Sequence, residues 1–290
     1  MNKDGDVLKI KRKPEWMRIK IQGGEKAAEV RNLISDLHLN TVCSEANCPN
    51  RMECFESRTA TFMILGSKCT RNCNFCDVIH GTPDMVDKDE PAHIGEAVRR
   101  LGLKHAVVTS VTRDDLPDEG ATQFRDVIRE IRKKNPDTTV EVLIPDLHGK
   151  EEYMDIIYDE KPDVLNHNIE TVPSLYKKVR PGAKFDRSLK VLDYAKKRGL
   201  VTKTGIMVGL GETEEEMIET FKALREIDVN MLTIGQYLRP SLDHLEVEEY
   251  VTPAQFNKYK EIALDMGFKE VASGPFVRSS YKAKAIKLDE

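Results

Sequence analysis

The sequence predicts an α/β fold, an open partial (β/α)6 barrel whose N-terminal and C-terminal extensions close over its open rim. Short apolar segments alternate with amphipathic helical segments between residues 59 and 250, which indicates a parallel sheet with right-handed crossovers. Six strand–helix units fit in this region, whereas a closed eight-unit barrel takes about 250 residues. We therefore expect an N-terminal extension over residues 1–58, the barrel over 59–250, and a C-terminal helix and tail over 251–290.

Strand-length apolar segments support the barrel assignment. A helix is expected first, over residues 25–39, because apolar residues recur there at helical spacing. The predicted strands then follow in chain order, at 61–65, 105–111, 139–144, 163–169, 201–208 and 231–238.

Helix signals lie between and after these strands. The apolar spacing from Phe124 to Ile131 predicts one amphipathic helix. A capping box formed by Thr213 and Glu216 begins another. The pair Thr252–Pro253 opens the last helix, which we expect to stop at Gly267.

Composition limits the possible classes of protein. The 290 residues include 45 Lys+Arg and 49 Asp+Glu, so the net charge of −4 argues against a surface built to bind nucleic acid. With 40% hydrophobic and 32% charged residues, the chain has the make-up of a soluble globular protein. It has no apolar run near the roughly 18 residues of a membrane span and no secretory signal. We expect a cytoplasmic protein that binds neither nucleic acid nor membrane.

The cysteines are strongly clustered. All six lie between residues 43 and 76, and the rest of the chain has none. A cytoplasmic chain of this size does not depend on disulfides, so the cluster predicts metal ligation or thiol catalysis. The six form two triples: Cys43, Cys48 and Cys54, then Cys69, Cys73 and Cys76.

The second triple, Cys69-x3-Cys73-x2-Cys76, follows the first predicted strand. Three thiolates in so tight a loop would surround one small centre. One possibility is zinc, with His80 as the fourth ligand. The other is a four-iron cluster held by three cysteines, whose open iron would bind a small molecule and make the centre catalytic.

Polar residues and glycines gather where the predicted strands end. Since the carboxyl ends of parallel strands meet at one rim, these residues are expected to converge there and form the site. The candidates are Thr109, Ser110, Asn168, Glu170, Gly209 and Gly211.

The Cys-x3-Cys-x2-Cys motif, with the aromatic Phe75 before its last cysteine, resembles the radical S-adenosylmethionine superfamily. The resemblance implies that the open iron of a [4Fe-4S] cluster binds S-adenosylmethionine. It also implies reductive cleavage of this molecule to methionine and a 5′-deoxyadenosyl radical, which abstracts hydrogen from unactivated carbon.

The first triple narrows the resemblance to the lipoyl synthase family. The similarity extends over most of the chain, through the segments 43–50, 107–116, 165–171, 180–182, 205–212 and 278–281. It implies a second, auxiliary [4Fe-4S] cluster on Cys43, Cys48 and Cys54, with a serine oxygen as fourth ligand. We assign that role to Ser280, with Ser279 as the alternative. Two residues depart from the family pattern: the family often has glycine in place of Glu119 and histidine in place of Lys282.

The resemblance also implies contacts to S-adenosylmethionine. Groups near Thr109 and Ser110 would meet the amine, and Asn168 and Glu170 the ribose. The planar fork of Arg180 would pair with the carboxylate, unless Glu170 and Arg180 form an ordinary surface ion pair. Backbone at Gly209 and Gly211 would approach the adenine. His167, on a strand, is interpreted as a core residue.

The implied activity is insertion of two sulfurs, at carbons 6 and 8, into an octanoyl chain on a lysine of a lipoyl carrier domain. The auxiliary cluster would supply the sulfur. The implied partners are the octanoylated carrier protein and a low-potential electron donor such as ferredoxin or flavodoxin. Two alternatives remain: another radical enzyme, such as a methylthiotransferase, and a non-enzyme that is either a zinc-stabilised binding module or an electron carrier.

Overall fold

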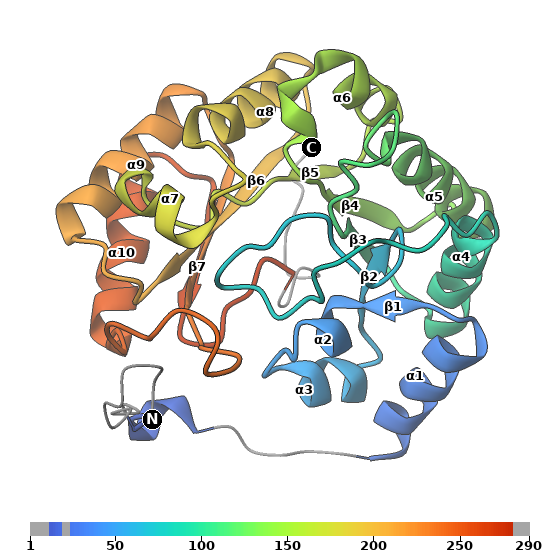
Figure 1. Cartoon of the computed structure of the whole chain (residues 1–290), viewed down its shortest axis with the longest axis horizontal. Helices are drawn as coiled ribbons and strands as arrows, with labels where there is room; N and C mark the ends of the chain where they lie inside the picture. The colour runs from blue at the N-terminus through green and yellow to red at the C-terminus, as the bar shows by residue number, and fades with distance from the viewer. Residues whose placement is uncertain (1–11, 19–23, 281–290) are drawn as a thin grey trace.

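The computed structural model describes residues 12–18 and 24–280, so the end of the predicted 251–290 segment, with Lys282, lies outside the described residues. One sheet of eight strands runs in the order β1 to β8 and curves into a barrel, with most of the helices outside it (Figure 1). All six predicted strands are confirmed, and they pair in parallel with their neighbours. They are β2 (Thr61–Ile64), β3 (His105–Ser110), β4 (Thr139–Leu143), β5 (Val164–Asn166), β6 (Thr202–Val208) and β7 (Met231–Gln236).

Two further strands extend the sheet beyond the prediction. β1 (Asn40–Thr41) pairs antiparallel with β2, and β8 (Glu270–Gly274) pairs in parallel with β7. β1 is too short for a sequence pattern to be visible, and β8 holds only one fully apolar side chain among small and polar ones. In the described part of the chain β1 and β8 do not pair with each other, so the barrel stays open.

The helices agree with the prediction to within a few residues. The predicted helix over 25–39 is α1 (Glu25–Asp36), and the capping box of Thr213 and Glu216 begins α9 (Glu214–Glu226). Thr252 caps α10 (Pro253–Asp265). The other barrel helices are α4 (Glu90–Leu101), α5 (Ala121–Lys134), α6 (Glu151–Tyr158), α7 (Tyr176–Val179) and α8 (Phe185–Lys197).

The core lies between the strands and the surrounding helices. On α5, the predicted apolar face from Phe124 to Ile131 is fully buried against α4 and the sheet. Burial of each such side chain stabilises the fold by about 1.5–3 kcal/mol. The N-terminal extension adds a smaller cluster, in which α1 packs against α3 (Arg51–Glu56) around Val30 and Phe55.

The interior of the barrel is partly polar, because alternate side chains of the strands point toward its axis. Lys203 on β6 pairs with Glu141 on β4 at 3.0 Å, and Asn166 on β5 donates to the same carboxylate at 2.8 Å. These groups are buried, so the ion pair and the hydrogen bond to Glu141 replace contacts with water. Within the described residues, no helix is both long and apolar enough to cross a bilayer.

Candidate functional site

The Cys69–Cys76 loop follows β2 and is held by neighbouring strand ends. The thiol sulfur of Cys69 accepts hydrogen bonds from the backbone amides of Arg71, at 3.4 Å, and Thr112, at 3.3 Å. The carbonyl of Cys76 lies 3.0 Å from Nε2 of His244, in the segment after β7. The loop is thus positioned by elements from both sides of the barrel.

The three thiols of this loop share one partly dry environment. Burial, with a smaller contribution from the neighbouring thiols, raises the pKa of Cys76 to about 12. Burial also raises the pKa of Cys73; Cys69 and Glu170 act in the same direction, whereas Arg180 and Arg71 oppose them. Three thiols in one loop form a donor set that fits a metal centre, and a bound metal would deprotonate them.

The spacing of the thiols favours a cluster over a single zinc ion. Zinc binds thiolates at about 2.3 Å, which brings their sulfurs to about 3.8 Å from one another. Within the described residues, neither cysteine triple has all its sulfurs within 4.8 Å of one another. His80 pairs with Cys69 through a β-bridge and its side chain is exposed. A larger centre suits this arrangement better than the zinc alternative.

The N-terminal triple lies in the segment from α2 (Val42–Glu45) to α3. Burial, with a smaller contribution from neighbouring thiols, raises the pKa of Cys43 to about 11 and that of Cys54 to about 12. All six cysteines are free thiols. Each triple therefore offers three soft donors to one centre.

The C-terminal segment after β8 folds back to the N-terminal triple. Nδ2 of Asn50, between Cys48 and Cys54, donates to the carbonyl of Phe276 at 2.7 Å. The hydroxyl of Thr61 donates to Oγ of Ser280, also at 2.7 Å, and the backbone of Thr61 hydrogen-bonds the thiol of Cys43. Ser280 thus lies on the side of the first triple.

Ser279 faces a different neighbour. Its hydroxyl donates to Oδ1 of Asn168 at 2.9 Å, at the end of β5. Ser280 therefore contacts a neighbour of the first triple, whereas the preceding residue, Ser279, contacts the barrel rim. This arrangement supports Ser280 over Ser279 as the ligand candidate.

Two glycines make room for this segment. A Cβ atom at Gly235 on β7 would lie 2.2 Å from the carbonyl oxygen of Val277. A Cβ atom at Gly205 on β6 would lie 2.9 Å from Oγ of Ser279 and 2.7 Å from Oδ1 of Asn168. The backbone can approach so closely only because no side chain stands between.

Asn168, Glu170 and Arg180 meet at the rim. Nδ2 of Asn168 donates to Oε1 of Glu170 at 3.1 Å, and Nη1 of Arg180 donates to the carbonyl of Asn168 at 2.8 Å. Burial raises the pKa of Glu170, and Arg180 opposes this increase. Glu170 and Arg180 form no salt bridge with each other, and neither is exposed. The alternative that they form an ordinary surface ion pair is therefore wrong.

Two buried polar atoms at the rim lack a partner. Among the described residues, Oγ of Ser110 and Nε of Arg180 have no hydrogen-bond partner. The hydroxyl of Thr109, in contrast, donates to the carbonyl of Leu143 at 2.8 Å. Because buried polar groups are normally satisfied, Ser110 and Arg180 fit a polar ligand at this rim.

The predicted glycines lie in the turn after β6. Gly209 and Gly211 have φ of +93° and +110°, which glycine adopts without strain. A Cβ atom at Gly209 would lie 2.4 Å from the carbonyl oxygen of Glu249 and 2.2 Å from Nε2 of Gln236. Packing within the chain therefore already requires glycine at 209, and its approach to adenine remains a prediction.

His167 is a core residue, as predicted. Its ring nitrogens lie 2.9 Å from the carbonyl oxygen of Ile144 and 3.0 Å from Oγ of Ser188. Burial lowers its pKa to about 4, so the ring is neutral near pH 7.

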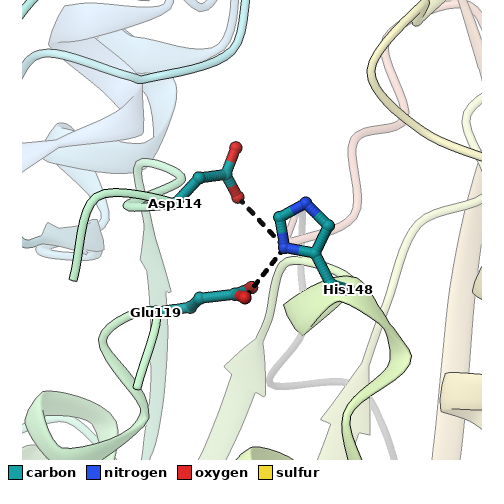
Figure 2. Close-up of side chains that lie close together, drawn as sticks. All are labelled: Asp114, Glu119 and His148. Atoms are coloured by element: carbon teal, nitrogen blue, oxygen red, sulfur yellow. Dashed lines mark hydrogen bonds and ion pairs between the residues drawn. The ribbon is translucent and has the colours of Figure 1, made fainter. Parts of the chain in front are cut away.

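A charged cluster beside the cysteine loop has no counterpart in the prediction. Asp114, Glu119 and His148 converge after β3 and β4 (Figure 2), with Nδ1 of His148 2.8 Å from Oε1 of Glu119. Lys150 and Arg71 reach the same carboxylates, at 3.2 Å and 2.8 Å. Because these cations already balance the acidic groups, we interpret the cluster as an ion-pair network. The signal that could have revealed it is Arg71, a charged residue between Cys69 and Cys73.

Comparison with known proteins identifies the family. Residues 63–224 match the radical SAM superfamily. The chain is 58% identical to the lipoyl synthase of Caldanaerobacter subterraneus subsp. tengcongensis, over 94% of this chain and 96% of that protein. It is 52% identical to the lipoyl synthase of Alkaliphilus metalliredigens, over 95% and 96%.

The chain belongs to the lipoyl synthase family. The predicted family is thereby confirmed. The predictions that the chain is a radical SAM enzyme and that it requires S-adenosylmethionine and iron–sulfur clusters are confirmed as well. Near-full-length matches to lipoyl synthases exclude the methylthiotransferase and non-enzyme alternatives.

Solved structures confirm the fold of this lipoyl synthase family member. Methylornithine synthase has a TM-score of 0.55 at 14% identity, over 91% of this chain and 88% of that one. Streptococcus suis SuiB bound to its precursor peptide SuiA has a TM-score of 0.58 at 12% identity, over 73% and 48%. At such identities the similarity concerns the fold, here the open α/β barrel.

Proposed function

We propose that this enzyme inserts two sulfur atoms, at carbons 6 and 8, into an octanoyl chain carried on a lysine of a lipoyl carrier protein. The observation that carries the proposal is the C-terminal segment. Ser280 contacts Thr61 beside the first cysteine triple, and Ser279 contacts Asn168 at the rim of the second. A substrate between the two triples would lie within reach of both centres.

The second triple is proposed to hold the cluster that works with S-adenosylmethionine. Cys69, Cys73 and Cys76 would bind three irons and leave one open. When bound, the cluster and S-adenosylmethionine supply a 5′-deoxyadenosyl radical. The amides of Arg71 and Thr112, which donate to the sulfur of Cys69, orient that ligand and moderate its charge.

The first triple is proposed to hold the sulfur-donating cluster. Cys43, Cys48 and Cys54 supply soft thiolates, and Ser280 completes the site with an oxygen. A hard oxygen is a weak match for an iron–sulfur centre, which suits a cluster that is consumed. The hydrogen bond between Asn50 and Phe276 supports this assignment, because it ties the segment that carries Ser280 to the cysteine loop.

The rim residues are proposed to bind S-adenosylmethionine. Arg180 has an unpartnered Nε and can present its planar fork to a carboxylate, while the free hydroxyl of Ser110 can meet the amine together with backbone at Thr109. Asn168 and Glu170, which already hydrogen-bond each other, offer an amide and a carboxylate to the ribose hydroxyls. Gly209 and Gly211 would lie beside the adenine.

A lipoyl-protein substrate follows from the family. We further propose an octanoylated lipoyl domain or a carrier of the H-protein type, and a ferredoxin or flavodoxin as electron donor. The cytoplasm is the proposed location, since its reducing conditions keep six free thiols available.

One experiment tests the proposal. The reconstituted protein is incubated without air with an octanoyl-lysine peptide, S-adenosylmethionine and a reductant, and the peptide is analysed by mass spectrometry. We expect a product with two added sulfurs and formation of 5′-deoxyadenosine. Formation of 5′-deoxyadenosine with an unmodified peptide would refute sulfur insertion.

A further inference from the structure

Thr61 touches two of the residues that the proposed function assigns to the auxiliary cluster. It is the first residue of β2 and is 7% exposed. Its side chain reaches Oγ of Ser280, 219 positions along the chain, and its backbone reaches the thiol of Cys43. A single residue thus links the N-terminal and C-terminal contributions to one site.

The hydroxyl of Thr61 is not explained by its place in the sheet. A buried strand position accepts valine as readily as threonine, because both are β-branched. A buried hydroxyl, however, carries a cost unless it forms a hydrogen bond. The partner that satisfies it here is Ser280, at 2.7 Å.

The direction of this hydrogen bond has a chemical consequence. When Oγ of Ser280 accepts from Thr61, one lone pair of the serine oxygen is engaged while another stays available. Groups that hydrogen-bond to a ligand atom in this way orient the ligand and tune the metal site.

We propose that Thr61 is a positioning residue of the auxiliary site: its hydroxyl holds Oγ of Ser280 beside the cysteine triple and sets how firmly the serine is retained. The inference rests on the proposed function for the role of Ser280. Ser279 and Phe276 anchor the same segment through Asn168 and Asn50, but Thr61 contacts the ligand atom itself.

The test compares Thr61→Val, which removes the hydroxyl, with Thr61→Ser, which keeps it. Full-length protein with both clusters is treated anaerobically with a ferrous chelator, and iron release is followed with time. A variant with Cys43, Cys48 and Cys54 all replaced by Ala lacks the auxiliary cluster. Its iron release therefore identifies the kinetic phase that belongs to the cluster on Cys69, Cys73 and Cys76. Thr138→Val is the matched control, since its buried hydroxyl donates to the carbonyl of Leu103 at 2.7 Å, away from both triples.

We expect Thr61→Val to release auxiliary iron about fivefold faster, the factor that corresponds to one net hydrogen bond. Thr61→Ser and Thr138→Val should match the unmodified protein, and the phase of the other cluster should not change. In a Ser280→Ala background, Thr61→Val should add no further effect, since the hydroxyl acts through Ser280.

Three results would overturn the inference: unchanged release from Thr61→Val, equal acceleration in Thr61→Ser, or an undiminished effect of Thr61→Val in the Ser280→Ala background. The assay contains no octanoyl peptide, so it does not depend on sulfur insertion. A protein that keeps two clusters but fails to thiolate the peptide would refute the proposed function and leave the Thr61 measurement intact.

Discussion

Nε and Nη2 of Arg71 donate to the two carboxylate oxygens of Asp114, each at 2.8 Å. Nη1 of the same guanidinium donates to Asp146, also at 2.8 Å. Arg71 stands between Cys69 and Cys73, whereas Asp114 and Asp146 follow β3 and β4. The cysteine loop is therefore fastened to two strand ends by one largely buried side chain.

Arg71→Gln should weaken both the fold and the cluster loop. Removing one partner of a buried ion pair leaves uncompensated charge, so we expect the free energy of unfolding to fall by about 3 kcal/mol. Iron retention at Cys69, Cys73 and Cys76 should fall with it. Urea unfolding and iron analysis measure the two effects. Arg129→Gln, which removes an exposed pair with Glu160, is the control and should change neither. Unchanged stability in Arg71→Gln would contradict the prediction.

The two cysteine triples should separate by function. Each is expected to hold four irons, so the reconstituted protein should contain about eight irons per chain. Cys73→Ala should abolish cleavage of S-adenosylmethionine, whereas Cys48→Ala should still form some 5′-deoxyadenosine but no carbon–sulfur bond. Chromatography of 5′-deoxyadenosine and mass spectrometry of the peptide report the two activities. Identical residual chemistry in the two variants would show that the division of roles is wrong.

Gly235→Ala should displace the C-terminal segment. The new Cβ atom would lie 2.2 Å from the carbonyl oxygen of Val277, and backbone at this position cannot yield as a flexible side chain would. We expect about four irons per chain in place of about eight, with cleavage of S-adenosylmethionine retained. Gly274→Ala is a matched control on the paired strand, since its Cβ atom would meet only Cγ2 of Val277 at an ordinary 3.5 Å. Full auxiliary iron in Gly235→Ala would argue against the prediction.

His167 should make stability depend on pH below neutrality. Burial lowers its pKa to about 4 in the folded protein, against about 6.5 when unfolded. Between these values the unfolded chain binds the proton and the folded chain does not, so stability falls as pH falls. We expect a loss of about 2 kcal/mol from pH 7.5 to pH 5.

His167→Gln should remove that part of the pH dependence, because glutamine keeps a donor and an acceptor but does not titrate. Urea unfolding of both proteins at the two pH values provides the comparison. The prediction fails if the difference between pH 7.5 and pH 5 is the same in both.

The barrel was predictable because its parallel strands are buried on both faces and read as short continuous apolar runs. The segment predicted at 163–169 is shorter in the structure, where β5 ends at Asn166. Beyond it, Glu170 takes a left-handed conformation with φ of +66° and forms only an isolated bridge to Ile206. Such a conformation depends on the packing around Glu170, which its sequence neighbours do not specify.

The site was predictable in its residue types but not in its contacts. Cysteine spacing indicated two metal centres, because neighbouring ligands lie within one loop. Nothing local connects Thr61 with Ser280, or Arg71 with Asp146, since each pair meets only when distant strand ends converge. The same convergence gives Glu119, named above as a departure from the resemblance, its partners: its buried carboxylate contacts His148 and Lys150.

The contact between Thr61 and Ser280 also fixes an order of events during synthesis. The two residues are 219 positions apart. A ribosome that adds about 5–20 residues per second makes Ser280 roughly 10–40 s after Thr61. Through that interval the nascent chain contains Cys43, Cys48 and Cys54 but not yet the serine proposed to join them. If Ser280 is the fourth ligand, as proposed, the auxiliary site can reach its four-ligand form only after translation has passed residue 280.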